Sequence, residues 1–401
     1  MNDISDITNK TPGAARLREF VQKAAAGDDL VVVFFGGSIT QGSLASSEET
    51  CYARVFCNLL GEHFPKSSFT YVNSGVGGTG SHYGAMRVST DVLSYSPDLV
   101  VIDFSVNDTE AVLPLYGEGE TAAQGDTDWS GGRNTDSSGS ALKLYPETWE
   151  GVLRRILSCD SRPAVLVLGN CFYDTGISVE DEHNAIADHY GVPHMSVRDR
   201  ILPLIREGRY TREDLSPDGL HPNDKGHRLI AEELMRLMLQ YEESAGELPV
   251  RDEEALPSPL TANAYEYTER LDSANSAPEL YGFSPDNASH ENDNYNFFRG
   301  GWTASQIGDR FEIDVEGSGI AVVYRKTIHR PSPVARLVLD GDEEHAVILD
   351  GNFDQDWGDC LYLQPILHHG NRGRHHISIV ITEATPGDLV PFYLLCIGVS
   401  T

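Results

Sequence analysis

Short apolar runs that alternate with helix-forming segments are the feature that most constrains the fold of this chain. Residues 30–35 (LVVVFF) and 99–104 are continuous runs rich in β-branched and aromatic side chains. Such runs are typical of strands buried on both faces. Segments with the apolar spacing of helices lie between them. Strands that alternate with helices predict a parallel sheet covered by helices on both faces, a three-layer α/β fold.

This alternating pattern continues to about residue 245, and we interpret residues 1–245 as the first domain. The predicted strands are 30–35, 68–72, 99–104 and 164–168. The predicted helices are 14–26, 53–60, 84–93, 146–157, 179–189 and 227–240.

The remainder of the chain has a different pattern. Residues 241–259 are acidic, contain proline and lack periodicity, which is typical of a linker or of a connection wrapped on a domain. Short alternating segments follow, separated by Gly, Asp and Pro turns, at 310–315, 320–324, 335–339, 346–349, 376–381 and 392–399. This pattern predicts an all-β sandwich of the jelly-roll type over residues 260–401.

Composition and charge exclude several classes of partner. A net charge of −31 repels phosphate backbones and anionic headgroups, so we expect neither a nucleic-acid nor a membrane partner. The first ten residues lack the basic and apolar regions of a secretory signal. The six cysteines are scattered without metal-ligand spacing, which favours free thiols in a reducing compartment. We therefore expect a cytoplasmic protein, and its oligomeric state, including a homo-oligomer, stays open.

A glycine-rich turn, GGSITQG, follows the first predicted strand at residues 36–42. A side chain that follows a parallel strand lies at the carboxyl edge of the sheet, where ligands bind. Ser38 is therefore a candidate nucleophile. A plain loop or a phosphate-binding turn is the alternative, although the phosphate interpretation lacks the lysine of a P-loop.

Three further motifs follow strands or precede the last helix. Gly75 lies in NSGVGGTG and could donate its backbone N–H to an oxyanion, and Asn107 in SVND could donate its side-chain amide. Asp218 and His221 lie three residues apart in DGLH. A serine nucleophile needs a histidine base and a carboxylate that orients the base. Each motif alone is also compatible with an ordinary turn.

Taken together, GGSIT, the Gly of NSGVGG, the Asn of SVND and the DGLH pair resemble the four blocks of the SGNH (GDSL-type) hydrolase superfamily. The resemblance covers about residues 30–240. It implies Ser38 as nucleophile, His221 as general base and Asp218 as the residue that orients the base. It also implies an oxyanion hole made of the N–H groups of Ser38 and Gly75 and the side chain of Asn107.

Two positions depart from the family pattern. Gly37 stands where the GDS signature has aspartate, and Ser105 stands where the third block has glycine. Neither position belongs to the implied triad. The α/β-hydrolases, the nearest competing fold, place a G-x-S-x-G nucleophile in mid-chain with Asp and His far apart, and this sequence does not match that arrangement.

The two-domain layout resembles bacterial carbohydrate acetylesterases that carry a C-terminal carbohydrate-binding-like β domain. By analogy with some members of that group, an aromatic residue of the β domain is expected to contact the sugar. The candidates here are Trp357 and Trp302, with a core tryptophan as the alternative. The polar segment 110–144 is either a lid or a disordered insertion. The histidine pairs 368–369 and 375–376 lack an obvious carboxylate partner, so we expect no metal site. Arg87 could bridge to Asp103 or Asp91, and we interpret it as structural.

We therefore predict a serine esterase that removes O-acetyl groups from carbohydrate, such as acetylated manno- or xylo-oligosaccharides, through an acetyl-serine intermediate. No metal or organic cofactor is expected. The alternatives are an SGNH lipase or thioesterase, which would need a long apolar trench, and a non-catalytic carbohydrate-binding protein, which would not need all five site residues.

Overall fold

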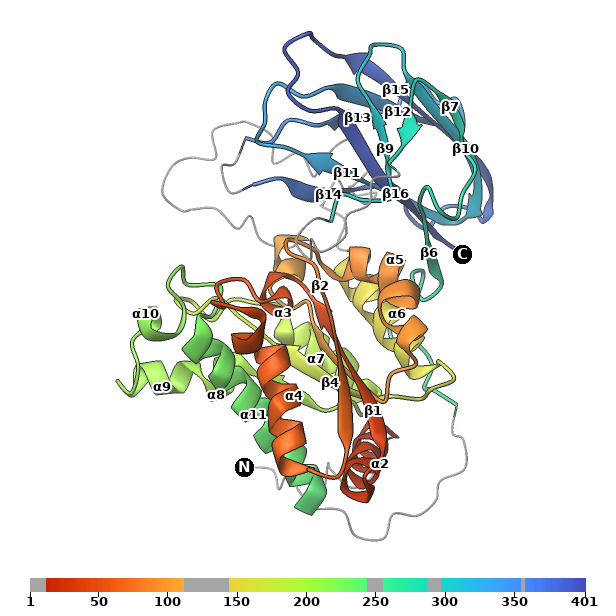
Figure 1. Cartoon of the computed structure of the whole chain (residues 1–401). Helices are drawn as coiled ribbons and strands as arrows, with labels where there is room; N and C mark the ends of the chain where they lie inside the picture. The colour runs from red at the N-terminus through yellow and green to blue at the C-terminus, as the bar shows by residue number, and fades with distance from the viewer. Residues whose placement is uncertain (1–11, 112–143, 244–254, 287–296, 355–357) are drawn as a thin grey trace. The chain divides into compact units, whose positions relative to one another are not determined.

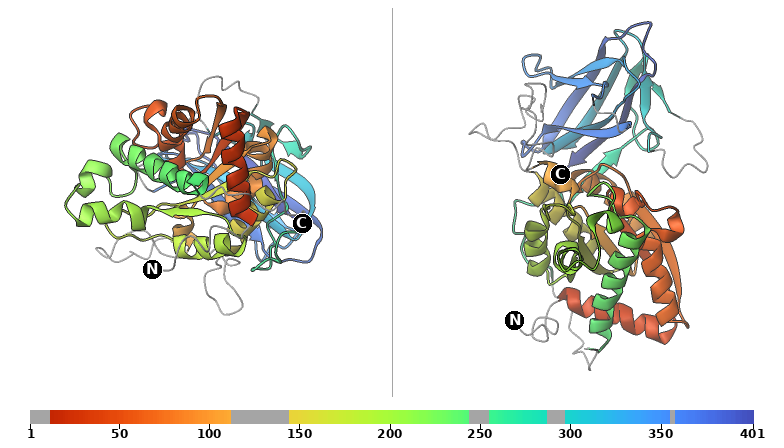
Figure 2. Two further views of the ribbon diagram at one scale, coloured as in Figure 1. Left: turned by 90° about the horizontal axis from the view of Figure 1, so that it is seen from below. Right: turned by 90° about the vertical axis from the view of Figure 1, so that its left-hand side faces the viewer.

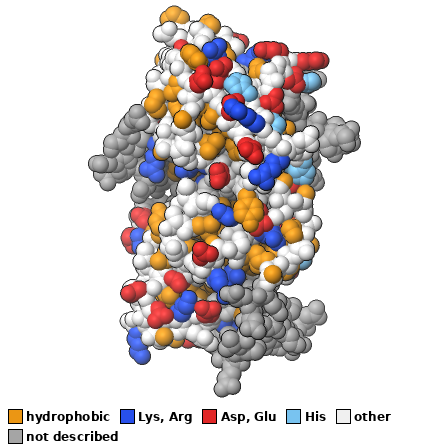
Figure 3. Space-filling model, turned by 90° about the vertical axis from the view of Figure 1, so that its right-hand side faces the viewer, with side chains coloured by type: hydrophobic (Ala, Val, Ile, Leu, Met, Phe, Trp, Pro, Cys, Tyr) orange, Lys and Arg blue, Asp and Glu red, His pale blue; other side chains and the backbone are white. Residues whose placement is uncertain are grey.

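The computed structural model describes residues 12–111, 144–243, 255–286, 297–354 and 358–401. These residues form two compact units, the second of which begins at Tyr267. Figures 1 and 2 show a unit of strands and helices in red to green and a unit of strands in blue. None of the helices in these ranges has the length and apolar character needed to cross a membrane. Figure 3 shows acidic and basic side chains interspersed over the face that it draws.

The first unit is built on a parallel sheet with the strand order β2-β1-β3-β4-β5. Its strands are β1 Asp29–Gly36, β2 Ser68–Gly75, β3 Leu99–Asp103, β4 Ala164–Gly169 and β5 His194–Ser196. Its longer helices are α2 Pro12–Ala26, α4 Tyr52–His63, α5 Ser81–Asp91, α6 Tyr145–Leu157, α7 Glu180–His189 and α11 Asp224–Glu243. Its shorter helices are α3 Ser38–Gln41, α8 Val197–Arg200, α9 Leu202–Arg206 and α10 Arg212–Leu215, with 3-10 turns η1 Glu48–Thr50, η2 Leu93–Tyr95 and η3 Asn107–Ala111.

The two faces of the sheet bury alternate residues of β1. Val32 and Phe34 pack in the apolar cluster formed with α2, α4 and α11. Val33 and Phe35 pack in the cluster formed with α5, α6 and α7. The predicted three-layer arrangement is therefore confirmed. The sequence pattern did not reveal β5, because a strand of three residues, His-Met-Ser, carries no β-branched side chain and no alternation.

The second unit consists of antiparallel strands in two sheets, with the orders β13-β12-β15-β10-β7 and β14-β11-β16-β9-β8, and β6 also pairs with β16. The strands are β6 Thr268–Leu271, β7 Glu279–Tyr281, β8 Ser284–Pro285, β9 Trp302–Ala304, β10 Arg310–Gly317, β11 Gly319–Lys326, β12 Val334–Leu339, β13 Val347–Asp350, β14 Cys360–Leu367, β15 Gly373–Glu383 and β16 Phe392–Ser400.

Residues from both sheets of the second unit form one apolar core, as expected for a β-sandwich. Strand β14 was not predicted, because Gln364 and Pro365 interrupt its alternation. Its position at the end of the strand order accounts for the proline, which an edge strand tolerates because one side of that strand is unpaired.

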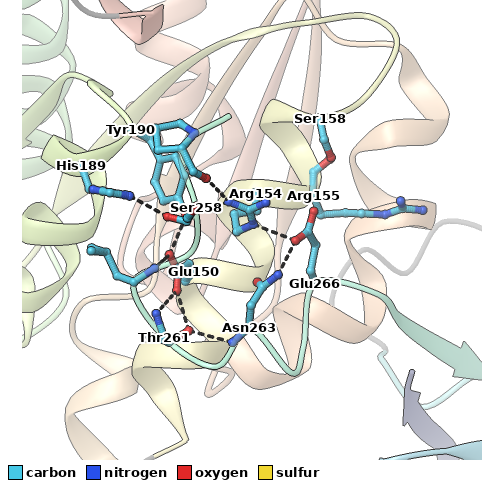
Figure 4. A network of polar contacts seen from close by, with 12 residues as sticks. Glu150, Arg154, Arg155, Ser158, His189, Tyr190, Ser258, Thr261, Asn263 and Glu266 are labelled. Carbon is cyan, nitrogen blue, oxygen red and sulfur yellow. Dashed lines mark hydrogen bonds and ion pairs between the residues drawn. The ribbon is translucent and has the colours of Figure 1, made fainter. Parts of the chain in front are cut away.

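Residues 255–259, the described part of the predicted linker, belong to the first unit together with residues 260–266. This segment contacts α6 and α7. On α6, Glu150 accepts hydrogen bonds from the backbone N–H groups of Leu260 and Thr261, each at 2.7 Å. On α7, the His189 ring lies 2.8 Å from the carbonyl oxygen of Ser258. Figure 4 draws this contact as a dashed line. The described part of this segment is therefore a connection wrapped on the first unit.

Candidate active site

Ser38 is the first residue of α3 and follows β1 at the carboxyl edge of the sheet. The two glycines before it allow the chain to pass close to its neighbours. A Cβ atom on Gly36 would lie 2.3 Å from Thr40 Oγ1 and 2.4 Å from the carbonyl oxygen of Asp103. The chain turns tightly here because glycine carries no side chain, and the serine hydroxyl is presented at the edge of the sheet.

His221 lies beside this serine, although 183 residues separate the two in the sequence. The distance between Ser38 Oγ and His221 Nε2 is 2.8 Å. On the other side of the ring, His221 Nδ1 lies 2.7 Å from Asp218 Oδ2. Because a carboxylate only accepts, Nδ1 carries the proton and donates, and Nε2 is left to accept from the serine hydroxyl. The three side chains form the hydrogen-bonded chain that activates a serine nucleophile.

Asp218 is held ionised by its own turn. Its Oδ1 atom accepts hydrogen bonds from the backbone N–H groups of Leu220 at 2.9 Å and His221 at 2.8 Å. Partial burial alone would raise the pKa of Asp218, but the hydrogen bonds from the His221 ring and from these two N–H groups lower it below its ordinary value. The carboxylate is therefore charged at neutral pH and stabilises a positive charge on His221.

Gly219 makes the turn between Asp218 and His221 possible. Its φ angle is +80°, in the left-handed region that favours glycine, and a Cβ atom would lie 2.3 Å from Asp174 Oδ2. Its carbonyl oxygen accepts from the backbone N–H of Tyr173 at 2.8 Å. The glycine of DGLH is thus required by the local backbone and by a close neighbour.

Asn107 begins η3 after the end of β3, and its side chain lies against Gly37. A Cβ atom built on Gly37 would be 2.0 Å from Asn107 Oδ1. Any side chain at residue 37 would meet the Asn107 amide and displace it. The side chain of Asn107 thus lies next to the residue that precedes Ser38.

Gly75 ends β2 and pairs with Gly36 in the sheet. A Cβ atom on Gly75 would lie 2.2 Å from the backbone nitrogen of Gln41 in α3, so the close packing of β2 on α3 requires glycine here. Its N–H donates to Asn73 Oδ1 at 2.9 Å. To donate to an oxyanion, the N–H of Gly75 must first release the side chain of Asn73. The oxyanion role of Gly75 stays a prediction.

Residues that the sequence did not single out connect β2 and the loop after it to α3. Gln41 Oε1 accepts from the backbone N–H of Gly77 at 2.9 Å, and Asn73 Nδ2 donates to the carbonyl oxygen of Thr40 at 2.8 Å. Both side chains lie inside motifs that we examined for other residues. Their roles depend on which backbone groups face them, which residue types alone do not indicate.

A buried acid, Asp103, ends β3 below the nucleophile turn. It is 4% exposed and accepts a hydrogen bond from Asn170 Nδ2 at 2.7 Å. Burial raises the pKa of Asp103 to about 7, against the smaller effects of hydrogen bonds from Asn170 and Ser105. A carboxyl whose pKa is near neutrality is therefore buried at the end of β3.

The remaining site predictions concern the second unit. Trp302 is 1% exposed and packs edge-to-face on Phe311 at 4.9 Å between ring centroids, so the structure places it in the core of the sandwich. Such a ring has no free face for a sugar. Trp357 and most of segment 110–144, residues 112–143, lie outside the described residues.

The second histidine pair does have carboxylate partners, contrary to our expectation. His375 Nδ1 lies 2.7 Å from Asp340 Oδ2, and His376 Nδ1 lies 2.9 Å from Asp314 Oδ1. The sequence could not indicate these pairs because they join residues of neighbouring strands or turns that are far apart along the chain.

The parallel α/β fold and the Ser-His-Asp chain at the carboxyl edge of its sheet are typical of hydrolases that use a serine nucleophile. The model of the GDSL-like Lipase/Acylhydrolase family matches residues 34–229. Together with the structural similarity below, this match shows that the chain belongs to this family and is an ester hydrolase, as the sequence motifs predicted.

Two solved structures are similar to this chain over nearly its whole length. The chain is similar to the crystal structure of a two-domain esterase (CEX) active on acetylated mannans, with 38% sequence identity and a TM-score of 0.85 over 98% of this chain and 97% of that chain. It is equally similar to that esterase co-crystallized with mannopentaose, with 38% identity and a TM-score of 0.84 over 98% and 96% of the two chains. A search of the curated proteins finds no match.

Proposed function

We propose that this protein is a serine esterase that removes O-acetyl groups from carbohydrate. The observation that carries the proposal is the chain of hydrogen bonds from Ser38 through His221 to Asp218 at the carboxyl edge of the sheet. The similarity over nearly the whole length to an esterase active on acetylated mannans supports an acetylated manno-oligosaccharide as substrate, and xylo-oligosaccharides belong to the same class. We assign the chemistry to the first unit and propose that the second unit, which begins at Tyr267, is the carbohydrate-binding-like domain.

The proposed reaction has two halves. Ser38 Oγ attacks the acetyl carbonyl carbon while His221 Nε2 takes the hydroxyl proton, and Asp218 stabilises the imidazolium. The tetrahedral intermediate collapses, His221 gives its proton to the sugar oxygen, and the free sugar hydroxyl leaves an acetyl group on Ser38. Water then attacks this ester with His221 again as base, and acetate and free Ser38 result. No step requires a metal or a redox cofactor.

The developing negative charge on the acetyl oxygen needs donors that are in place before the reaction. We propose the backbone N–H of Ser38, the N–H of Gly75 and the side-chain amide of Asn107. The contact of Asn107 with Gly37 supports its part in this set. Gly75 contributes only when its N–H leaves the side chain of Asn73.

Acetate release from a panel of acetylated manno-, xylo- and gluco-oligosaccharides, read by mass spectrometry, tests the proposal. We expect release from at least one acetylated oligosaccharide, hydrolysis of p-nitrophenyl acetate, and loss of both in Ser38→Ala. Activity that rises with acyl chain length and is absent on sugars would favour a lipase or thioesterase. Sugar binding with no ester hydrolysis would favour a non-catalytic binding protein. The cytoplasmic location stays a prediction, and cell fractionation would test it.

A second experiment tests Trp357, which we still propose as a sugar-stacking residue. One aromatic platform contributes on the order of 1–2 kcal/mol, so Trp357→Ala should lower kcat/KM on an acetylated oligosaccharide about 5–30-fold. The rate on p-nitrophenyl acetate should not change, because that ester has no sugar ring to stack. Equal loss on both substrates would contradict the proposal.

A further inference from the structure

A fully buried arginine lies next to the strand ends that carry the proposed site. Arg87, on α5, has 0% exposure. Its guanidinium donates through Nη1 to the carbonyl oxygen of Ser74 at 2.7 Å and through Nη2 to that of Gly36 at 3.0 Å. It also pairs with Asp91 Oδ2 at 3.1 Å, one of the two partners that the sequence suggested. The contacts to backbone carbonyls were not predicted.

The two carbonyls mark the points where the functional loops leave the sheet. Gly36 is the last residue of β1 and leads directly to Gly37 and Ser38. Ser74 is the residue before the last of β2 and leads to Gly75 and the loop that contacts α3. The guanidinium therefore joins the origin of the nucleophile turn to the origin of the neighbouring loop.

The surroundings of Arg87 indicate that this side chain does more than fill space. The guanidinium carbon lies 4.3 Å from the ring centre of Phe35 and 5.5 Å from that of Tyr83. A charge buried among aromatic rings is costly unless its N–H groups are bonded, and an apolar side chain would fill this space at lower cost. A planar fork with several donors can bond two carbonyls at once, whereas a lysine has a single nitrogen.

We propose that Arg87 is a positioning residue that holds the Ser38 turn and the loop after β2 at a fixed separation. The inference rests on the proposed function only in naming what is positioned, a serine nucleophile and its oxyanion donors. A displacement of about 1 Å between reacting groups costs on the order of 10²-fold in rate, so the ends of β1 and β2 need a rigid connection.

The test compares Arg87→Met and Arg87→Lys with Arg18→Met, a matched control. Arg18 is also a buried arginine of the first unit, at 1% exposure, and lies on α2. With p-nitrophenyl acetate we expect Arg87→Met to lower kcat about 10- to 100-fold with KM within about threefold. Arg87→Lys should restore part of this loss, because it keeps the charge and one hydrogen bond. Arg18→Met should lower the melting temperature and leave kcat unchanged.

Amide hydrogen exchange gives a readout that does not depend on catalysis. Arg87→Lys should accelerate exchange in peptides that contain residues 36–42 and 74–80 and leave the β4 peptide unchanged, and this variant decides the matter if Arg87→Met does not fold. Arg87 variants with wild-type kcat and unaltered local exchange would overturn the inference while the esterase proposal stands. A wild-type protein without esterase activity would overturn the proposed function, and the exchange pattern would still decide whether Arg87 holds the two loops.

Discussion

Asp218 and Glu150 are two carboxylates of the first unit that accept similar numbers of hydrogen bonds. One of them is exposed and the other is buried. Asp218 is 45% exposed, and its principal partner is the titratable ring of His221. Glu150 is fully buried. Its donors are the Tyr190 hydroxyl and the hydroxyl and backbone N–H of Thr261, together with the N–H of Leu260. In the proposed mechanism Asp218 supports a ring that gains and loses a proton, whereas Glu150 accepts hydrogen bonds from neutral donors.

We call Glu150, Arg154, Tyr190, Thr261 and Glu266 the connector clasp (Figure 4). Arg154 donates to Glu266 at 2.7 Å and to the Tyr190 hydroxyl at 3.0 Å. The hydrogen bonds of the connector clasp hold the segment before the second unit against α6. Asp218 and Glu150 thus differ in burial and in the chemistry of their donors, and not in the number of hydrogen bonds that they accept.

Removal of the nucleophile or the base should have the largest effect. Ser38→Ala and His221→Ala should each lower kcat by about 10⁵–10⁶-fold, and the double variant should be no slower than either, because the two residues act as one unit. Initial rates on p-nitrophenyl acetate measure this, with melting curves as the control for folding. If Ser38→Ala keeps an activity within tenfold of wild type, Ser38 is not the nucleophile. The role of Asp218 would then be contradicted as well, because Asp218 acts on Ser38 through His221.

Asp218→Ala should lower kcat by about 10⁴-fold, less than loss of the base itself, because His221 remains but is no longer oriented. The melting temperature should change little, since Asp218 is half exposed. A large loss of stability with little loss of kcat would make Asp218 resemble Glu150 and would contradict the comparison.

Asn107→Ala should lower kcat about 10²–10³-fold with KM nearly unchanged, because its amide meets a negative charge only in the transition state. If KM rises while kcat is retained, Asn107 binds the ground state of the substrate instead. Gly37→Ala is a matched probe of the same contact. Its new Cβ must displace the Asn107 side chain, so kcat should fall in the same direction by a smaller factor, about 10- to 100-fold.

Glu150→Gln should have the smallest effect on the chemistry and act on stability. We expect a loss of about 2–4 kcal/mol in the free energy of unfolding, because several buried donors lose a charged acceptor. The kcat on p-nitrophenyl acetate should stay within about twofold of wild type. Glu207→Gln, an exposed glutamate of the same unit, is the control.

The loss of stability in Glu150→Gln should depend on pH. Burial alone would raise the pKa of Glu150, but hydrogen bonds from Thr261, Tyr190 and two backbone N–H groups lower it below 4.5. A lowered pKa in the folded state contributes stability above the unfolded value, and that contribution is lost as the pH falls through the folded value. The difference in melting temperature between wild type and Glu150→Gln should therefore be full at neutral pH and shrink below about pH 4.5. A difference that is constant down to pH 3 would contradict the ionised clasp.

Several elements could be predicted because their signal is local. The run 30–35 indicated a strand buried on both faces, and β1 does bury alternate residues in two clusters. The strand β5 and the early strands of the second unit were missed because they are two to four residues long, and pairing with neighbours rather than composition defines them. For Trp302 the sequence left two interpretations open, a sugar-stacking residue and a core residue, and its burial supports the core residue.

The sequence by itself determined the fold class and the residues offered for chemistry. A glycine-rich turn after a buried strand and a DGLH turn before the last helix lead to one edge of a parallel sheet, because the carboxyl ends of parallel strands lie at that edge. The tertiary structure alone decided the 2.8 Å between Ser38 and His221, the contact of Asn107 with Gly37 and the reach of Arg87 to two strand ends. These contacts join elements distant in the chain, and strand register and helix packing set their distances, neither of which a local pattern of residues encodes.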